Sequence, residues 1–239
     1  MDRIAIVTGG AKRVGRVLVE GLLADGWTVL AHAHHDEDEV PAGALKVVAD
    51  LAEPDCADRI MAACPGAPAL LVNNAARFAH DAVGAFSLAE FQAHMAVNVA
   101  APALLTEAFA AAGQGERLIV NVLDAKLAAP NPDYLSYTLS KAALASLTEL
   151  SARALAERGI RVNGVAPALM LHSPGQTSEN FAAAHAHNPL RRGVEPADVL
   201  CAIRFLLDSP AITGEVLTID GGQRFWSLDR DVQFLDLTS

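Results

Sequence analysis

The stretch "RIAIVTGGAKRVG" at residues 3–15 decides the fold class of this 239-residue chain. A short apolar run, typical of a buried strand, enters a glycine-rich turn, and an amphipathic helical pattern follows it. The glycines let a phosphate approach the backbone, and the N–H groups at the start of the helix favour an anion there. Two cations lie at the same point. The residues that we expect to bind phosphate are Gly9, Lys12, Arg13, Val14 and Gly15.

Short apolar runs recur along the rest of the chain and alternate with helical patterns. Such alternation indicates a mainly parallel sheet that is covered by helices on both faces. We therefore expect a single α/β domain over residues 1–239, a Rossmann-like, doubly wound fold with a seven-stranded, mainly parallel sheet. The strands are expected at residues 3–8, 27–33, 44–50, 69–74, 117–122, 160–167 and 215–220, and the helices at 14–25, 55–63, 88–112, 137–158 and 196–207.

Two segments fit this alternation poorly. Residues 169–189 are polar and contain a helix-compatible stretch, and we expect them to form a lid-like segment that contacts the substrate. Residues 223–239 form a C-terminal tail that carries Phe225 and Trp226. These aromatic rings could pack at an interface or close a neighbouring subunit's pocket, and the sequence leaves the choice open.

Charge and cysteine content exclude several classes of protein. The formal net charge is −10, which is unfavourable for a nucleic-acid partner because phosphate contacts need a basic face. No apolar run approaches the length of a membrane span, so we expect no membrane partner. The three cysteines, Cys56, Cys64 and Cys201, are spaced for neither a zinc site nor a redox pair, which favours a cytoplasmic location.

The end of the second expected strand bears on the choice of cofactor. An acidic residue there would hydrogen-bond a free ribose hydroxyl and repel a 2′-phosphate, but the position holds Ala33. His34 and His35 follow, and with the cations of the first turn they favour NADPH over NADH, although Asp36 could fold back toward the same place. His32 and His34 share a strand face that lacks a third ligand, so we expect no metal.

The segment "DAKLAAPNPDYLSYTLSK" at residues 124–141 carries three groups that are suited to acid–base chemistry. Tyr137 and Lys141 are four residues apart at the start of an expected helix and therefore share a face. A nearby ammonium favours the phenolate, so we expect Lys141 to lower the pKa of Tyr137 from its ordinary value of about 10. Asp124 lies at the end of an expected strand, thirteen residues before the tyrosine.

Seven motifs, in this order, resemble the short-chain dehydrogenase/reductase family over residues 3–222. They are "TGGAKRVG" (8–15), "ADL" (49–51), "NNAA" (73–76), "VNV" (97–99), "YTLSK" (137–141), "RVNGVAP" (161–167) and "IDGG" (219–222). The resemblance implies a Rossmann-like domain, a nicotinamide cofactor and a homotetramer built through the helices at 88–112 and 137–158. The further residues that it implies in cofactor binding are Asn74, Ala75, Pro167 and, on the adenine side, Asp50 and Leu51.

The resemblance also implies that Asn98 supports proton relay. Two departures from the family pattern point to one branch of the family. Most members carry serine where this chain has Asp124 and glycine where it has Arg13. Both residues resemble the branch of pteridine reductases and dihydromonapterin reductases, in which an aromatic ring follows the "NNA" turn. Phe78 occupies that position and could instead be ordinary core. The residues that the branch implies in substrate binding are Arg13, Phe78, Asp124 and Tyr137.

We therefore expect an NADPH-dependent reductase that transfers a hydride to a dihydropterin such as dihydromonapterin, with Asp124, Tyr137 and Lys141 relaying the proton. One alternative is a generic carbonyl reductase or alcohol dehydrogenase with an atypical aspartate. Another is a non-catalytic regulator that only binds NADP(H) and would need no paired tyrosine and lysine.

Overall fold

Seven strands form one sheet in the order β3-β2-β1-β4-β5-β6-β7, and every neighbouring pair is parallel. The computed structural model describes residues 3–172, 176–226 and 228–235. The expected α/β class is confirmed, and the sheet is wholly rather than mainly parallel. The strands are β1 (Ile4–Val7), β2 (Thr28–Ala33), β3 (Leu45–Val48), β4 (Leu70–Asn73), β5 (Arg117–Val122), β6 (Ile160–Pro167) and β7 (Val216–Ile219).

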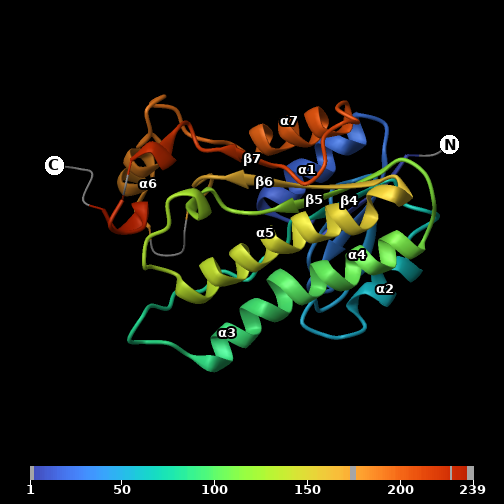
Figure 1. The fold of residues 1–239 in the computed structure, drawn as a ribbon, viewed down its shortest axis with the longest axis horizontal. Helices are drawn as coiled ribbons and strands as arrows, with labels where there is room; N and C mark the ends of the chain where they lie inside the picture. The colour runs from blue at the N-terminus through green and yellow to red at the C-terminus, as the bar shows by residue number, and fades with distance from the viewer. Residues whose placement is uncertain (1–2, 173–175, 227, 236–239) are drawn as a thin grey trace.

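Helices cover both faces of this sheet (Figure 1). On one face, Leu18 of α1 and Ile203 of α7 share a buried cluster with Val7 of β1. On the other face, Phe109 of α4 shares a second cluster with Ile6 of β1. Because both faces are buried, the strands are mostly apolar and show no alternation of polar and apolar residues. The helices are α1 (Arg13–Ala24), α2 (Cys56–Ala62), α3 (Leu88–Met95), α4 (Ala101–Ala111), α5 (Leu135–Leu155), α6 (Ser178–His185) and α7 (Pro196–Leu207).

A crevice is expected beside β1, where the winding of the sheet reverses. β1 pairs with β2 on one side and with β4 on the other, so the chain segments that leave the carboxyl ends of β1 and β4 diverge. The glycine turn follows β1, and the "NNAA" segment follows β4. The loop after β5 carries Asp124, and α5 begins close to it in Figure 1. The fold therefore brings all the predicted motifs to one edge of the sheet.

The helix expected at residues 88–112 consists of α3, a π-helical segment and α4. The π-helical segment is Ala96–Ala100. Pro102 lacks an N–H group and cannot donate to the carbonyl of Asn98, four residues earlier. The irregularity is common at functional sites, and here it places the Asn98 side chain toward the segment that follows β4.

The expected lid and tail lie beside each other at one end of the molecule (Figure 1). The lid contains α6, and its residues 173–175 lie outside the described part of the chain. The tail contains two short 3-10 turns, Gln223–Phe225 and Val232–Phe234, while residues 227 and 236–239 lie outside the described part. Asn180 of α6 donates to the carbonyl of Leu235 at 3.3 Å, which joins the two segments.

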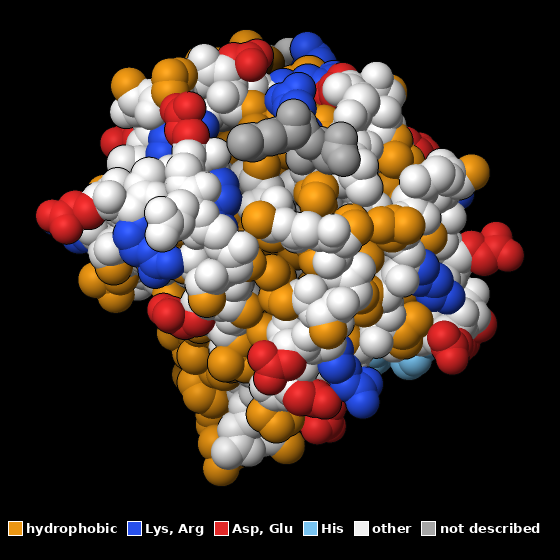
Figure 2. All heavy atoms as spheres, turned by 90° about the vertical axis from the view of Figure 1, so that its right-hand side faces the viewer, with side chains coloured by type: hydrophobic (Ala, Val, Ile, Leu, Met, Phe, Trp, Pro, Cys, Tyr) orange, Lys and Arg blue, Asp and Glu red, His pale blue; other side chains and the backbone are white. Residues whose placement is uncertain are grey.

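Part of the surface is apolar. Figure 2 shows acidic and basic side chains interspersed around the edge of one face, with apolar side chains gathered at the lower left. The helices α4 and α5 also carry exposed apolar side chains. Exposed leucines on these two helices are Leu104, Leu139 and Leu150. None of the helices in the described ranges is both long and apolar enough to cross a lipid bilayer.

Candidate active site

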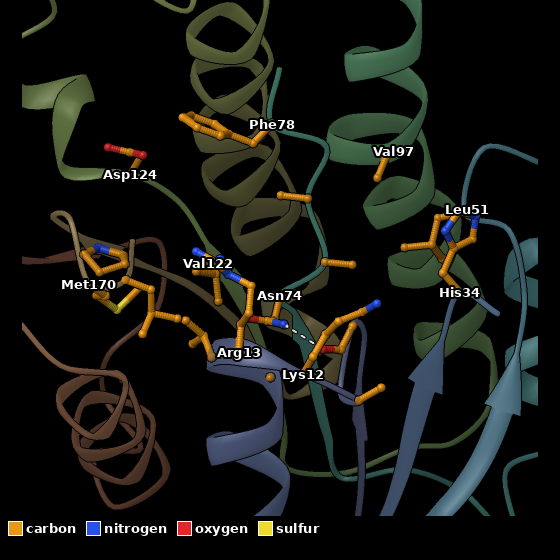
Figure 3. A pocket seen from close by; sticks show the side chains of 18 of the residues that line it. Lys12, Arg13, His34, Leu51, Asn74, Phe78, Val97, Val122, Asp124 and Met170 are labelled. Carbon is orange, nitrogen blue, oxygen red and sulfur yellow. Dashed lines mark hydrogen bonds between the residues drawn. The ribbon is translucent and has the colours of Figure 1, made fainter. Parts of the chain in front are cut away.

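A cavity of about 590 Å³ runs along the carboxyl edge of the sheet (Figure 3). Asp124 lies at one end and His34 at the other, which suits an extended ligand with its reacting group at one end. Two predicted site residues, His35 and Asn98, lie outside the lining. The predicted residues that line the cavity are Gly9, Lys12, Arg13, Val14, Gly15, His34, Asp50, Leu51, Asn74, Ala75, Phe78, Asp124, Tyr137, Lys141 and Pro167.

The glycine turn leaves space for phosphate at the start of α1. A Cβ atom at position 15 would lie 2.0 Å from the Gly9 carbonyl oxygen, so only glycine fits. Gly9 itself has φ +64°. Lys12, the N-cap of α1, makes no side-chain capping bond, which leaves the first N–H groups of the helix to a ligand. These features fit the phosphates of a dinucleotide.

Arg13 lies where the family resemblance implies a glycine, and its backbone has a conformation that favours glycine. Its φ is +54°, a left-handed conformation that costs an L-residue about 1–2 kcal/mol. Its two terminal guanidinium nitrogens, Nη1 and Nη2, each donate to the carbonyl of His172 at 3.3 Å, so the side chain joins the phosphate turn to the start of the lid. Strain that is kept at a ligand cavity indicates a function for the side chain.

His32 supports the phosphate turn from beneath, a role that the sequence did not reveal. The ring is buried, its Nδ1 accepts the Gly9 N–H at 3.0 Å, and its Nε2 donates to the carbonyl of Ala49 at 2.9 Å. Burial lowers the pKa of this imidazole, which favours the neutral form that both bonds require. The sequence feature that could have indicated this role is a histidine within an otherwise apolar strand.

Asp38, not Asp36, is the acid that folds back toward the adenine end. Its Oδ1 accepts a hydrogen bond from Lys12 Nζ at 2.9 Å, and this bond lowers the pKa of the Asp38 carboxyl. Ala33 lines the same end and leaves the usual acidic position vacant. A cofactor with a 2′-phosphate would therefore compete with Asp38 for the Lys12 ammonium.

The two neighbouring histidines differ in their positions. His34 lines the cavity, with its Nε2 at 3.8 Å from Asp50 Oδ1. His35 does not line the cavity, and its ring lies against that of His34, with centroids 3.9 Å apart and the planes tilted by 33°. Only the first of the two predicted histidines is placed to contact a cofactor.

Asp124, Tyr137 and Lys141 lie together at the end of β5. The Tyr137 hydroxyl donates to Asp124 Oδ2 at 2.8 Å, and the Lys126 N–H donates to Asp124 Oδ1 at 2.8 Å. Lys141 is buried and donates to the carbonyl of Val122 at 2.7 Å. Two bonds therefore fix the carboxylate at the reacting end of the cavity.

The predicted direction of the Tyr137 pKa is wrong. Burial, followed by the neighbouring Asp124 carboxylate, raises the pKa of this phenol well above its ordinary value. Lys141 does not offset these effects, because it is bonded to Val122 and burial lowers its own pKa to about 8. Tyr137 therefore keeps its proton at neutral pH and acts as a hydrogen-bond donor.

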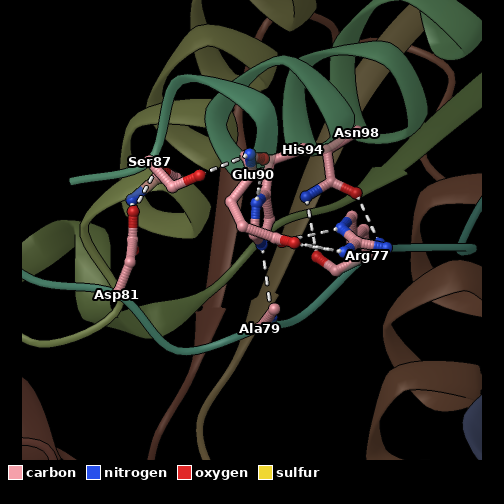
Figure 4. Close-up of polar contacts among 8 residues, drawn as sticks. Arg77, Ala79, Asp81, Ser87, Glu90, His94 and Asn98 are labelled. Atoms are coloured by element: carbon pink, nitrogen blue, oxygen red, sulfur yellow. Dashed lines mark hydrogen bonds and ion pairs between the residues drawn. The ribbon is translucent and has the colours of Figure 1, made fainter. Parts of the chain in front are cut away.

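The segment after β4 is fastened to α3 and the π-helical segment (Figure 4). Asn98 accepts the Arg77 N–H at 2.7 Å and donates to the Arg77 carbonyl at 3.0 Å. His94 Nε2 accepts the Ala79 N–H at 3.2 Å. These bonds hold the backbone on both sides of Phe78, so the geometry gives Asn98 a positioning role.

Asp81, in the same segment, caps α5. Tyr134, the N-cap of α5, has φ +55° and makes no side-chain capping bond. Asp81 instead accepts the Ser136 N–H at 2.9 Å and the Ser136 hydroxyl, and its carbonyl accepts the Leu135 N–H at 3.2 Å. A buried carboxylate at the positive end of a helix is favourable. The segment that holds Phe78 therefore also fixes the start of α5.

Phe78 is not an ordinary core residue, because 44% of it is exposed. Its ring stacks on Tyr134 at a centroid distance of 4.4 Å and meets Tyr137 edge-on at 4.7 Å. One face of the ring is thus supported by protein. The exposed remainder of the ring can receive a flat ligand beside Asp124.

Comparisons with known proteins agree with this geometry. A family model described as "Enoyl-(Acyl carrier protein) reductase" matches residues 10–224. The crystal structure of FolM alternative dihydrofolate reductase 1 from Brucella suis, in complex with NADP, matches with a TM-score of 0.86 and 36% sequence identity, over 95% of this chain and 97% of that chain.

Two curated relatives show the breadth of the similarity. Pteridine reductase 1 of Leishmania tarentolae is 30% identical over 92% of this chain and 95% of its own length. 3beta-Hydroxysteroid dehydrogenase 1 of Eggerthella lenta is 29% identical over 94% of both chains. From the motifs, the sheet order, the paired tyrosine and lysine and these matches, we conclude that the chain belongs to the short-chain dehydrogenase/reductase family and is an oxidoreductase.

Proposed function

We propose that this protein is an NADPH-dependent pteridine reductase that reduces a dihydropterin such as dihydromonapterin. The observation that carries the proposal is the Asp124 carboxylate, which accepts the Tyr137 hydroxyl at 2.8 Å. The similarity to proteins named as FolM and pteridine reductase 1 supports it.

The reacting end of the cavity suits a flat heterocycle better than a simple ketone. A pterin ring presents N–H groups, and a carboxylate accepts such donors through two oxygens, whereas the serine of most relatives offers one hydroxyl. Stacking on the exposed part of Phe78 would contribute about 0.5–1.5 kcal/mol beyond the burial of apolar area. Both features lie within one cavity.

The residues present can hold and move the required proton. NADPH, when bound, supplies the hydride, so that a C=N bond gains two electrons at carbon and a proton at nitrogen. Tyr137 keeps its proton and donates a hydrogen bond to Asp124, which faces the cavity and can pass a proton taken from solvent to a ring nitrogen. Solvent replaces the proton that is consumed. The buried amine of Lys141 is a further ionisable group at the same end of the cavity.

A generic carbonyl reductase is the second candidate function. The 29% identity to 3beta-hydroxysteroid dehydrogenase 1 favours it, since that identity is close to the value for pteridine reductase 1. Under this alternative Asp124 would replace serine in orienting a carbonyl group.

We also propose that the protein is a homotetramer built through α4 and α5. The exposed leucines on these helices, Leu104, Leu139 and Leu150, support this arrangement because a contact between subunits through α4 and α5 would remove them from water. We expect light scattering to give four times the chain mass, and Leu150→Arg to yield smaller species. A wild-type monomer at micromolar concentration would contradict the proposal.

The substrate class and the role of Asp124 can be tested together. We expect the wild type to oxidise NADPH with dihydropterins faster than with simple ketones. Asp124→Asn should lower kcat with a dihydropterin by about 10²-fold or more, because the amide cannot relay a proton, and should leave the Kd for NADPH unchanged. Ketone turnover without pterin turnover, or a rise in ketone turnover in Asp124→Ser, would favour the carbonyl reductase instead.

Arg13→Gly should separate stability from cofactor binding. Relief of the left-handed strain, about 1–2 kcal/mol, is offset by the entropic cost of glycine, about 0.5–1 kcal/mol, and by the loss of the hydrogen bonds to the His172 carbonyl, so the free energy of unfolding of the ligand-free protein should change little. The Kd for NADPH should rise about tenfold or more, because a charge-assisted hydrogen bond to phosphate is lost.

Arg191→Gly is the matched control for that variant. Arg191 has φ +53° and lies in an exposed turn outside the cavity lining. It should be slightly more stable than the wild type in urea denaturation, because the left-handed strain is relieved, and its Kd for NADPH should be unchanged. If both variants bind NADPH as the wild type does, Arg13 has no part in cofactor binding.

The buried amine of Lys141 predicts a pH-dependent stability. The folded protein releases this proton at a pKa of about 8, while the unfolded chain keeps it up to the ordinary lysine pKa of 10.5, so the unfolded state binds more protons between these values. The contribution of Lys141 to stability is therefore least favourable below pH 8 and rises toward pH 10.5.

We expect the free energy of unfolding of wild type, relative to Lys141→Met, to increase by about 2 kcal/mol between pH 7.5 and 9.5. Chemical denaturation of both ligand-free proteins measures this difference. The exposed Lys46→Met serves as the control and should show no such change. A pH-independent difference for Lys141→Met would contradict the buried placement of the amine.

A further inference from the structure

A buried histidine of α3, His94, lies outside the cavity lining and contacts the segment that carries Phe78. From the geometry of this contact we propose that His94 is a positioning residue that orients the Phe78 ring for stacking on a flat substrate. The proposal rests on the pteridine reductase function. It deepens that function, because it names a residue that governs the affinity for the ring without touching the ring.

A rigid peptide group lies on each side of the Phe78 Cα atom. The group before it carries the Arg77 carbonyl, which accepts a hydrogen bond from Asn98 Nδ2 at 3.0 Å. The group after it carries the Ala79 N–H, which donates to His94 Nε2 at 3.2 Å (Figure 4). The two backbone dihedrals of Phe78 are the rotations between these groups. The pair of bonds therefore fixes the direction in which the Phe78 side chain leaves the backbone.

The His94 ring is held in one neutral tautomer. The Ala79 N–H can only donate, so His94 Nε2 carries no proton and accepts. The proton is then on Nδ1, which lies 2.8 Å from the carbonyl of Glu90, one turn earlier in α3, and donates to it. The ring is completely buried. It therefore joins α3 to the segment after β4 through two hydrogen bonds of fixed direction.

The ring that His94 directs lies against the catalytic groups. The Phe78 ring meets the Tyr137 ring edge-on at 4.7 Å, and the His94 ring itself lies 6.4 Å from the ring of Tyr137. Tyr137 in turn donates to Asp124. Packed groups therefore set the position of the stacking surface relative to the carboxylate, and His94 is one of them.

An ion pair also joins this segment to α3, but it is less suited to the role. Arg77 Nη2 lies 2.7 Å from Glu90 Oε2, and the two side chains are 40% and 38% exposed. Exposed pairs contribute little to stability because water screens them. The pair also holds the Arg77 side chain rather than a peptide group, so it does not fix the dihedrals of Phe78.

Amide side chains can separate the two ring nitrogens of His94. Glutamine reaches as far as Nε2 and can accept the Ala79 N–H, whereas asparagine reaches only as far as Nδ1. In steady-state NADPH oxidation, His94→Asn should raise the KM for a dihydropterin about tenfold, because the hydrogen bond is lost and stacking weakens. It should leave kcat within about threefold and the Kd for NADPH unchanged. His94→Gln should restore the KM to within about threefold of the wild type.

His32 supplies a reciprocal comparison, because it holds the phosphate turn with the opposite tautomer. Its Nδ1 accepts the Gly9 N–H, and its Nε2 donates to the carbonyl of Ala49. Here asparagine preserves the accepting position and glutamine does not. His32→Gln should therefore raise the Kd for NADPH more than His32→Asn does, with the pterin KM unaffected. If the same amide is the more harmful one at both positions, or if each variant weakens both ligands alike, the proposal is wrong.

Nitrogen-15 NMR of the ligand-free protein gives a readout that does not depend on turnover. We expect a protonated Nδ1 at His94 and a protonated Nε2 at His32. Glu90→Gln is the matched control, because it removes the ion pair and keeps the backbone carbonyl that His94 uses. It should leave the pterin KM within about twofold. A rise as large as that of His94→Asn would assign the positioning to the ion pair instead.

Two kinds of failure can be told apart. A His94→Asn variant with the pterin KM of the wild type, or a His94 that is protonated at Nε2, overturns the positioning role and leaves the proposed function standing. A wild type that reduces no dihydropterin overturns the proposed function and the role of His94 in pterin binding together, whereas the NMR tautomers still report whether the ring contacts are correct.

Discussion

The hydrogen bond between the Tyr137 hydroxyl and Asp124 joins the end of β5 to the first turn of α5, and the chemistry of the site depends on it. The bond holds a protonated phenol and a carboxylate at one end of the cavity. Burial favours the neutral phenol over the phenolate, and the neighbouring carboxylate acts in the same direction. The structure therefore keeps Tyr137 as a protonated hydrogen-bond donor to Asp124 rather than as a phenolate beside Lys141.

Several tethers keep this bond in place. The segment after β4 holds Phe78 through its neighbours Arg77 and Ala79, and the same segment supplies Asp81 as the cap of α5. Movement of this segment would therefore shift the Phe78 ring and the start of α5 together. On the cofactor side, buried His32 fixes Gly9 in the same way, so a side chain packed beneath the phosphate turn helps to determine its backbone shape.

Much of the architecture followed from local patterns in the sequence. Continuous apolar runs between helical patterns identified the strands, because strands that are buried on both faces need no alternation. Asp124 and Tyr137 were paired correctly because a motif spacing places them, although they belong to different elements. Arg13 was singled out because most members of the family carry glycine at this position. Its left-handed φ explains why glycine is common there.

Other features depend on distances in space that the sequence does not encode locally. Asp81 and Ser136 are 55 residues apart, and Asp133 and Arg230 are 97 apart, so neither the helix cap nor the docking of the tail had a sequence signal. The acid that folds back is Asp38 and not Asp36. The sequence could not distinguish the two, because the loop after β2 has no periodicity from which its path could be predicted. The direction of the Tyr137 pKa was wrong because it depends on burial and on where the Lys141 amine points.

The central claim is that a carboxylate, a phenol and an exposed aromatic ring converge to bind a flat heterocycle for hydride transfer. A crystal structure of the full chain with NADP⁺ and a dihydropterin tests it most directly. The account predicts the pterin ring against the exposed part of Phe78, with a ring N–H group within hydrogen-bonding distance of Asp124. A pterin bound elsewhere, or an Asp124 side chain turned away from both the ligand and Tyr137, would contradict it.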